Sequence, residues 1–210
     1  MADLNTNAQK SGTLLLFGAT GDLAQRMLLP SLYALHVDDL IAPDLRIFGT
    51  ARSDMSDDGY RDFAVKALNE YLPEERKDAA AIASFAERLF YQPLDASTIE
   101  GFDDLAAKIG DISGGLSIFL STAPFLFEPT IAGLKSAGLA GDNVRIGLEK
   151  PLGTDFASSA HINDAVAAVT TGTGELIVAA FEAGARRILV GVGGSAATAG
   201  GLGALQAMEP

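Results

Sequence analysis

Residues 13–24 read TLLLFGATGDLA, and this stretch decides the fold that the sequence predicts. A short apolar run is followed at once by a glycine-rich turn with the spacing Gly-x-x-Gly-x-x-Ala, which opens an amphipathic segment. In such a turn Gly18 permits the tight bend, Gly21 lets the backbone approach a pyrophosphate, and Ala24 allows close helix packing. We therefore predict a strand, a dinucleotide phosphate loop and a helix. The alternative is a glycine-rich turn that serves packing alone.

The chain up to about residue 169 alternates short apolar runs with amphipathic segments of helical spacing, a pattern typical of βαβ units. Because crossovers between parallel strands are right-handed, we expect an α/β protein with a Rossmann-like, doubly wound parallel sheet and helices on both faces. The predicted strands are 13–17, 45–49, 88–94, 116–120 and 144–149, and the predicted helices are 23–36, 58–71, 99–109, 129–137 and 156–169, with an extra helix over 73–87.

Composition narrows the class of protein. The 210 residues are 48% hydrophobic and 20% charged, which favours a folded globular chain. A net charge of −12 argues against nucleic acid or an anionic membrane as a partner. With no cysteine, disulfides, thiolate metal sites and cysteine nucleophiles are excluded, and no metal site is predicted. The leader 1–11 is polar, unlike a signal peptide, and no apolar run approaches the roughly 20 residues that span a bilayer, so we expect a cytoplasmic protein.

The end of the second predicted strand indicates which coenzyme is bound. It runs into Gly49-Thr50-Ala51-Arg52-Ser53, where an NAD site usually places an acidic side chain for the ribose hydroxyls. An arginine with small hydroxyl residues suits a 2′-phosphate instead, so the stretch favours NADP. The alternative is that Arg52 is a solvated surface residue.

Several blocks, taken in order and spacing, resemble the N-terminal, NADP-binding half of bacterial glucose-6-phosphate dehydrogenases over residues 12–169. They are FGATGDLAQRMLLPSLYALHVDDL, DLRIFGTARS, YRDFA, LFYQPLDA, LSIFLSTAPFLFEPTIAGLKSAGL and VRIGLEKPLGTDFASSAHINDAV. The resemblance implies an oxidoreductase of carbohydrate metabolism, in the pentose phosphate pathway, that converts glucose 6-phosphate and NADP to 6-phosphogluconolactone and NADPH.

The resemblance also implies roles for individual residues. The backbone of Gly18 and of Thr20, Gly21, Asp22 and Leu23 holds the coenzyme phosphates, and Thr50, Arg52 and Ser53 surround the 2′-phosphate. Beside the nicotinamide ring and ribose lie Ser121, Thr122, Ala123 and Pro124. At the end of the fifth strand Glu149 belongs to the coenzyme site and Lys150 contacts the sugar phosphate.

Structural alternatives exist for three of these residues and for Pro151, which follows Lys150. Asp22 in a first helical turn also favours the helix dipole. Lys150 is alternatively a surface lysine at a strand end, Pro151 a strand stop, and Pro124 a helix start.

One departure from the family concerns the first helix. Many members have a lysine two or three positions before the Leu-Pro pair that corresponds to Leu29-Pro30. Here the stretch reads Gln25-Arg26-Met27-Leu28-Leu29-Pro30, so Arg26 either substitutes for that lysine or is only a charge on the helix surface.

The resemblance stops before the block that carries the family's catalytic histidine. The reaction requires a general base, for which histidine suits neutral pH, but the two histidines, His36 and His161, lack the expected neighbours. No catalytic residue is therefore predicted. The first hypothesis is a glucose-6-phosphate dehydrogenase-like protein whose catalytic parts are incomplete in this chain, and the second is a non-catalytic NADP-binding module.

Composition changes after Val169. Residues 170–210 contain neither lysine nor aspartate, and about 172–208 resemble a piece of bacterial glycerate kinases. We expect a chimeric chain whose tail adds an αβα segment to the same sheet. The loop at Ser195 either joins those elements or binds an anion through its backbone amides. A glycerate kinase relic is the third hypothesis, and self-association through apolar surface exposed by the join is also expected.

Overall fold

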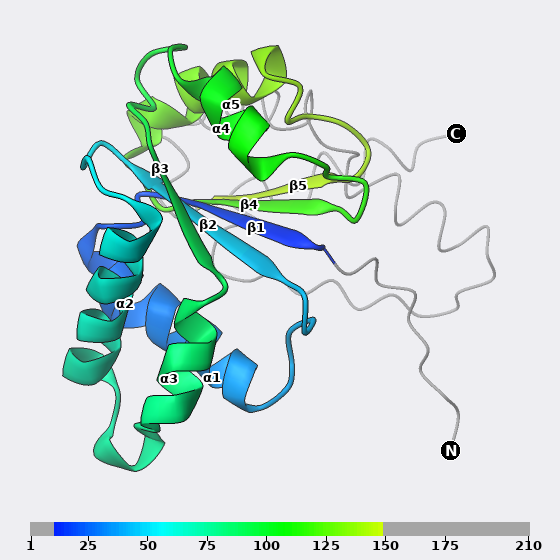
Figure 1. Ribbon diagram of the computed structural model, residues 1–210. Helices are drawn as coiled ribbons and strands as arrows, with labels where there is room; N and C mark the ends of the chain where they lie inside the picture. Colours follow the sequence, from blue (N-terminus) through cyan, green and yellow to red (C-terminus); the bar gives the residue numbers. More distant parts are fainter. Residues whose placement is uncertain (1–10, 149–210) are drawn as a thin grey trace, which may run out of the picture.

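The computed structural model describes residues 11–148 (Figure 1). Its centre is a sheet of five parallel strands in the order β3-β2-β1-β4-β5. The strands are β1 (Thr13–Phe17), β2 (Arg46–Ala51), β3 (Leu89–Pro93), β4 (Leu116–Leu120) and β5 (Val144–Leu148). The chain winds outward from β1 to β3, then crosses to β4 on the other side of β1. This reversal beside β1 is the switch point at which doubly wound sheets bind ligands.

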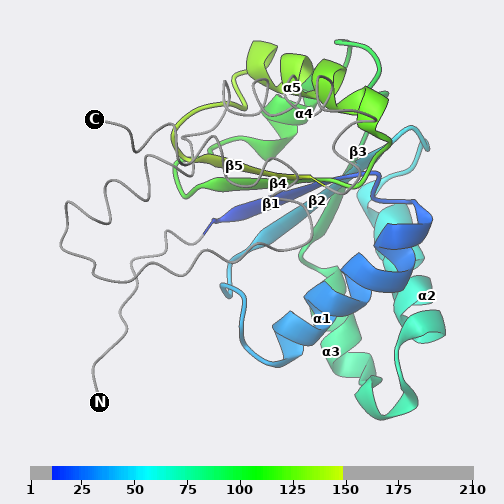
Figure 2. The same cartoon turned by 180° about the vertical axis from the view of Figure 1, so that it is seen from behind.

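Helices cover both faces of the sheet, as Figures 1 and 2 show from opposite sides. One layer holds the π-helical turn η1 (Ala24–Leu28), α1 (Leu29–Val37), α2 (Asp57–Tyr71), the short η2 (Glu74–Arg76) and α3 (Ala79–Ala86). The other holds α4 (Phe102–Ile109), the short η3 (Pro124–Leu126) and α5 (Phe127–Ser136). The predicted Rossmann-like fold class is therefore confirmed.

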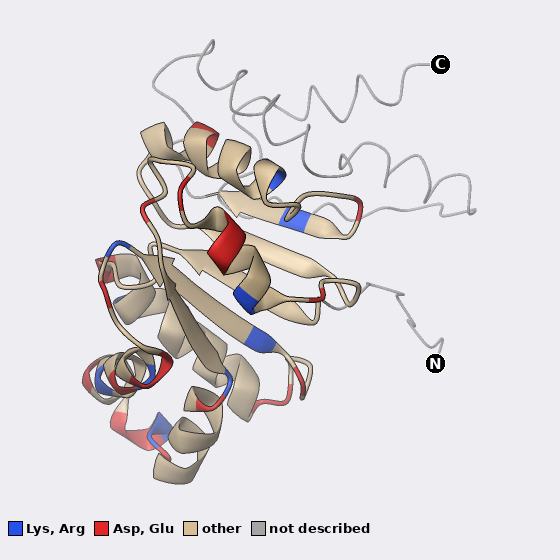
Figure 3. Cartoon of the chain, turned by 45° about the horizontal axis from the view of Figure 1, so that its top comes forward, with Lys and Arg blue, Asp and Glu red and all other residues tan. Residues whose placement is uncertain are grey.

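Two hydrophobic cores follow from this layering. The first helical layer packs on alternate strand residues such as Leu16 and Ile47, whereas the second packs on Leu15, Phe17 and Phe48. Alternation of side chains along each strand divides the two sets between the faces. The charged residues lie mostly on helices and turns, so the sheet itself is largely uncharged (Figure 3). No helix within residues 11–148 combines the length and apolar character that a membrane crossing requires.

The first predicted helix begins irregularly, and Pro30 explains why. In an α-helix residue 30 would donate its N–H to the carbonyl of Arg26, but proline has no N–H and its ring crowds that carbonyl. Instead, the preceding turn is widened, and the Leu29 N–H donates to the carbonyl of Ala24, five residues back. A π-helical turn thus accommodates the proline within a continuous helical segment.

Two other helices differ clearly from the predicted ranges, whereas α2 and α5 differ only by one or two residues at their ends. The segment 73–87 is not one helix, because the chain extends at Lys77 before Asp78 caps α3 by accepting the Ala81 N–H at 2.9 Å. The helix predicted from Ile99 begins only at Phe102, since Gly101 has a left-handed backbone (φ 83°). The predicted helix 156–169 and the segment 170–210 lie outside the described residues.

Candidate functional site

Three loops meet at the carboxyl ends of β1, β2 and β4. The N–H groups of Gly18 and Ala19 both donate to the Thr50 carbonyl, at 2.9 and 3.2 Å. On the other side, the Ser121 N–H and hydroxyl donate to the Phe17 carbonyl, at 3.2 and 2.9 Å. The structure therefore brings together the residues predicted for the phosphates, the 2′-phosphate and the nicotinamide side of a coenzyme, at the switch point of the sheet.

Gly18 is required at this meeting point for two reasons. Its backbone is left-handed, with φ +75°, a conformation that side chains with a Cβ rarely adopt. A Cβ on Gly18 would also lie 2.6 Å from the carbonyl oxygen of Ser121. The sequence indicated the tight turn, whereas the close approach of the β4 loop is visible only in the fold.

The turn exposes amides suited to an anion. The Gly21 N–H closes the turn on the Gly18 carbonyl at 2.9 Å, and the Gln25 N–H donates to the Gly21 carbonyl at 3.1 Å. The intervening amides, those of Asp22, Leu23 and Ala24, come before the first N–H that donates within the helix, that of Gln25, and so have no intrahelical partner. Because Gly21 and Asp22 are exposed, a phosphate group can reach this helix start.

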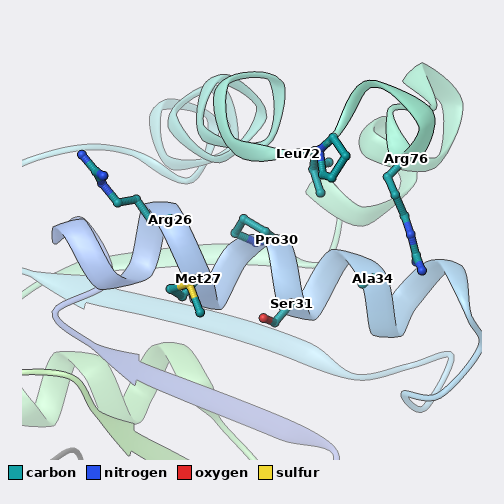
Figure 4. A pocket seen from close by; sticks show the side chains of 8 residues that line it. Arg26, Met27, Pro30, Ser31, Ala34, Leu72 and Arg76 are labelled. Atoms are coloured by element: carbon teal, nitrogen blue, oxygen red, sulfur yellow. The ribbon is translucent and has the colours of Figure 1, made fainter.

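Asp22 and Arg26 are engaged with each other on the helix surface. Arg26 Nε lies 2.6 Å from Asp22 Oδ1, and this pairing raises the pKa of the guanidinium. The guanidinium also lies over the Tyr71 ring, 5.4 Å from its centroid, which directs it toward α2. Figure 4 shows Arg26 and Met27 leaving the helix in different directions. These contacts favour the interpretation of Arg26 as a surface charge.

The β2 loop combines a buried hydroxyl with an exposed cation. Thr50 is fully buried, and its Oγ1 has no hydrogen-bond partner among residues 11–148. Arg52 and Ser53 are exposed. Hydrogen bonds from Ser97 lower the pKa of Asp95, and the charge of Arg52 lowers it further, which places the guanidinium within electrostatic range of the loop after β3.

The β4 loop carries the second orphaned hydroxyl of the site. Thr122 Oγ1 is buried and has no partner within the described part of the chain. Ala123 precedes η3, and Pro124 is its first residue, so Pro124 does begin a helical turn. Buried polar atoms normally have partners. Two such atoms in the loops predicted to surround a coenzyme therefore fit a polar ligand or its bound water.

One contact in this region had no signal in the sequence pattern. The hydroxyl of Tyr91, on β3, lies 2.8 Å from the carbonyl oxygen of Ser53 and 3.1 Å from that of Ala51. By sequence Tyr91 is one aromatic residue in a buried strand, and only the pairing of β3 with β2 shows that it reaches the loop containing Arg52.

His36 lies near the amino ends of the strands, whereas the three loops lie at their carboxyl ends. It is near the end of α1, a helix that starts at the carboxyl ends of the strands and runs back toward their amino ends. Its ring packs on Phe85, with the centroids 5.7 Å apart, and burial together with the nearby Arg88 lowers its pKa. His36 is thus a packed residue remote from the candidate site.

A shallow depression lies elsewhere, on the surface between α1 and the turn after α2 (Figure 4). Its volume is about 290 Å³, and its walls include Met27, Pro30, Leu72 and Arg76. None of the predicted coenzyme residues lines it. Glu149, Lys150, His161 and the Ser195 loop lie outside the described residues, so their roles stay predictions.

Known proteins share this sequence and fold. Residues 15–173 match the family model described as glucose-6-phosphate dehydrogenase, NAD binding domain. The glucose-6-phosphate 1-dehydrogenase of Zymomonas mobilis is 56% identical over 154 residues, which are 73% of this chain and 32% of that protein. The chain therefore spans about a third of the length of the curated relatives it matches.

Solved structures agree with the sequence match. The crystal structure of glucose-6-phosphate 1-dehydrogenase from Mycobacterium avium superposes with a TM-score of 0.69 at 32% identity, covering 76% of this chain and 34% of that one. A glucose-6-phosphate dehydrogenase in complex with its substrate glucose-6-phosphate shares the fold, with a TM-score of 0.65 at 24% identity, over 77% and 35% of the two chains. The matched family model is described as an NAD binding domain, which agrees with the predicted nicotinamide dinucleotide site. The chain belongs to the glucose-6-phosphate dehydrogenase family, whose NAD(P)-binding domain it carries.

Proposed function

We propose that this chain is the NADP-binding part of a glucose-6-phosphate dehydrogenase-type oxidoreductase, which oxidises glucose 6-phosphate to 6-phosphogluconolactone. The observation that carries the proposal is the junction of three loops around Gly18, Thr50 and Ser121, with two orphaned buried hydroxyls beside it. When bound, NADP supplies the hydride acceptor. The chain supplies the surface that binds and orients it.

Each loop has its own role in this proposal. The amides of Asp22 and Leu23 hold the coenzyme phosphates at the helix start, where the dipole favours negative charge. Arg52 neutralises the 2′-phosphate, and the exposed hydroxyl of Ser53 adds a hydrogen bond to it. Thr50, whose own hydroxyl is buried, holds this loop to the first one by accepting the Gly18 and Ala19 N–H groups. The backbone from Ser121 to Pro124 borders the nicotinamide ribose. Glu149 and Lys150 follow β5, and by family resemblance Lys150 binds the sugar phosphate.

We also propose that these 210 residues bind NADP without turning over glucose 6-phosphate on their own. A base must reach the sugar hydroxyl as hydride leaves. His36 cannot be this base, because it packs on Phe85 near the amino ends of the strands, away from the three loops. We further propose the chimeric organisation 12–169 plus 170–210, which rests on the resemblance of about 172–208 to glycerate kinases; the family match itself runs to residue 173.

Thermal unfolding with added coenzyme tests both proposals. A ligand that binds the folded state raises the unfolding midpoint, and at equal concentration the tighter ligand raises it more. NADP should therefore raise the midpoint more than NAD. Arg52→Ala should remove this difference. Arg76→Ala is the matched control, since it deletes another exposed arginine, from η2, outside the three loops.

Two results would contradict the proposals. Binding is excluded if neither coenzyme shifts the unfolding midpoint. Lack of turnover is excluded if glucose 6-phosphate and NADP together produce absorbance of NADPH at a rate proportional to protein concentration.

A further inference from the structure

Tyr91 links the edge strand β3 to the loop that presents Arg52. Its hydroxyl is 2.8 Å from the Ser53 carbonyl oxygen and 3.1 Å from the Ala51 carbonyl oxygen. A phenol has one proton to donate, so the two acceptors share it. These carbonyls belong to the residues on either side of Arg52, which means that one buried side chain fixes the backbone before and after the exposed guanidinium.

The Tyr91 ring is itself held firmly. It is fully buried and packs against the Tyr60 ring, with the centroids 5.0 Å apart. Its backbone N–H donates to Asp57 Oδ1 at 2.7 Å, and its carbonyl accepts from Lys108 Nζ at 2.6 Å. The hydroxyl is thus a fixed point against which the loop is positioned.

The phenol keeps its proton under ordinary conditions. Burial raises the pKa of Tyr91 to about 12, and the charge of Asp54 acts in the same direction. At neutral pH the group is therefore a donor to the two carbonyls and never a phenolate that would repel them.

A loop that is ordered before binding loses less conformational entropy when an anion binds to it. We propose that Tyr91 is a positioning residue for the 2′-phosphate: its hydroxyl holds Ala51–Ser53 so that Arg52 faces a phosphate on the adenosine ribose. Tyr91 thereby contributes to the choice of NADP over NAD. The inference rests on the function proposed above for this loop.

Calorimetric titration of the full 210-residue chain with adenosine 2′,5′-bisphosphate and with AMP tests this role, because the two ligands differ only in the 2′-phosphate. In Tyr91→Phe the ring stays and the donor is lost. We expect the affinity for the bisphosphate to fall about three- to tenfold, the range typical of a single hydrogen bond. The affinity for AMP should change less than about twofold, because its phosphate binds at the other loop.

Tyr60→Phe is the matched control. It deletes a hydroxyl from the neighbouring buried ring, and that hydroxyl has no partner among residues 11–148. We expect it to leave both affinities unchanged. Unfolding curves without ligand set a temperature at which all variants are folded, so a general loss of stability is not mistaken for a binding effect.

The outcomes separate the inference from the function on which it rests. If the wild-type chain does not prefer the bisphosphate to AMP, the proposed 2′-phosphate site is wrong, and the role of Tyr91 fails with it. If the wild type shows the preference and Tyr91→Phe retains it in full, only the positioning role is wrong. The same holds if Tyr91→Phe lowers the affinities for both ligands by the same factor.

Discussion

Asp57 and Lys108 meet across the free edge of β3, although their helices cover opposite faces of the sheet. Lys108 Nζ lies 2.8 Å from Asp57 Oδ1. The same carboxylate accepts the Tyr91 N–H, and the same ammonium donates to the Tyr91 carbonyl. In the described sheet β3 is an outer strand, so these backbone groups would otherwise be open to pairing with another strand. The ion pair closes the edge and joins the two helical layers.

Replacing Lys108 with methionine tests the stabilising effect of this closure. Lys108→Met keeps an apolar stem but removes the ion pair and the donor to the Tyr91 carbonyl. We expect the free energy of unfolding in urea to fall by about 1 kcal/mol, because the pair is partly exposed and one hydrogen bond is lost. Lys66→Met, on the exposed surface of α2, makes the same change in charge and is the control. Equal stability of the two variants would show that the closure contributes nothing.

Opening the edge should also change the association state. In the double variant Asp57→Asn, Lys108→Met the Tyr91 backbone loses its charged partners, while the Arg61 Nε contact to the Leu89 carbonyl at 3.2 Å remains. Unprotected edges pair with other chains, so we expect larger species at high protein concentration in analytical ultracentrifugation. The wild-type chain at the same concentration is the reference, and identical sedimentation profiles would contradict the expectation.

Stability should depend on the charge of Asp57. Burial acts to raise the pKa of this carboxyl, but the hydrogen bonds from Lys108 and from the Tyr91 backbone, with the charges of Lys108 and Arg61, outweigh it and lower the pKa. A group with a lower pKa in the folded state stabilises the fold above its unfolded value of about 4. That contribution is lost as the pH falls through the folded value.

Asp57→Asn removes this titration. The free energies of unfolding of this variant and of the wild type, measured in urea from pH 6 to pH 3, should therefore converge as the pH falls. A difference that stays constant over this interval would exclude Asp57 as a source of acid sensitivity.

The sequence predicted those parts of the fold that depend on local pattern. The strand Leu116–Leu120 was predicted with the bounds that the structure has, and Gly18 was assigned to the tight turn it makes. Contacts between strands distant in sequence were not predictable. The hydroxyl of Tyr91 and the approach of Ser121 to Gly18 depend on strand order and register, which no single segment encodes.

The predicted helix 23–36 is helical in the structure from Ala24 to Val37, but its irregular first turn was not predicted. Apolar spacing continues from 23 to 36, but the missing N–H of Pro30 changes the hydrogen bonding of the turn before it. In the candidate site, family resemblance supplied residues that periodicity does not indicate, such as Thr50.

The buried hydroxyl of Tyr60 should contribute nothing to stability. Tyr60 is fully buried, and its hydroxyl has no partner within residues 11–148. Because an unpaired buried polar group is unfavourable, Tyr60→Phe should leave the free energy of unfolding unchanged or raise it by up to about 1 kcal/mol. Tyr33→Phe is the contrast, since the Tyr33 hydroxyl donates to the Arg76 carbonyl at 3.0 Å and its loss should be destabilising. A clear destabilisation by Tyr60→Phe would reveal a partner such as an ordered water.

The contact between the β1 and β4 loops should account for much of the cost of replacing Gly18. Gly18→Ala combines an unfavourable backbone conformation with a Cβ 2.6 Å from the Ser121 carbonyl oxygen. Gly138→Ala has nearly the same backbone angle, φ +73°, but no atom within 4 Å of the added Cβ. Gly138→Ala should therefore cost only the conformational strain, on the order of 1–2 kcal/mol. Gly18→Ala should cost roughly 1–3 kcal/mol more through overpacking, and it should weaken NADP binding because the displaced loop carries Ser121. If urea unfolding gives the two variants the same stability, the β4 loop does not constrain the turn, and the proposed junction of the three loops loses its physical basis.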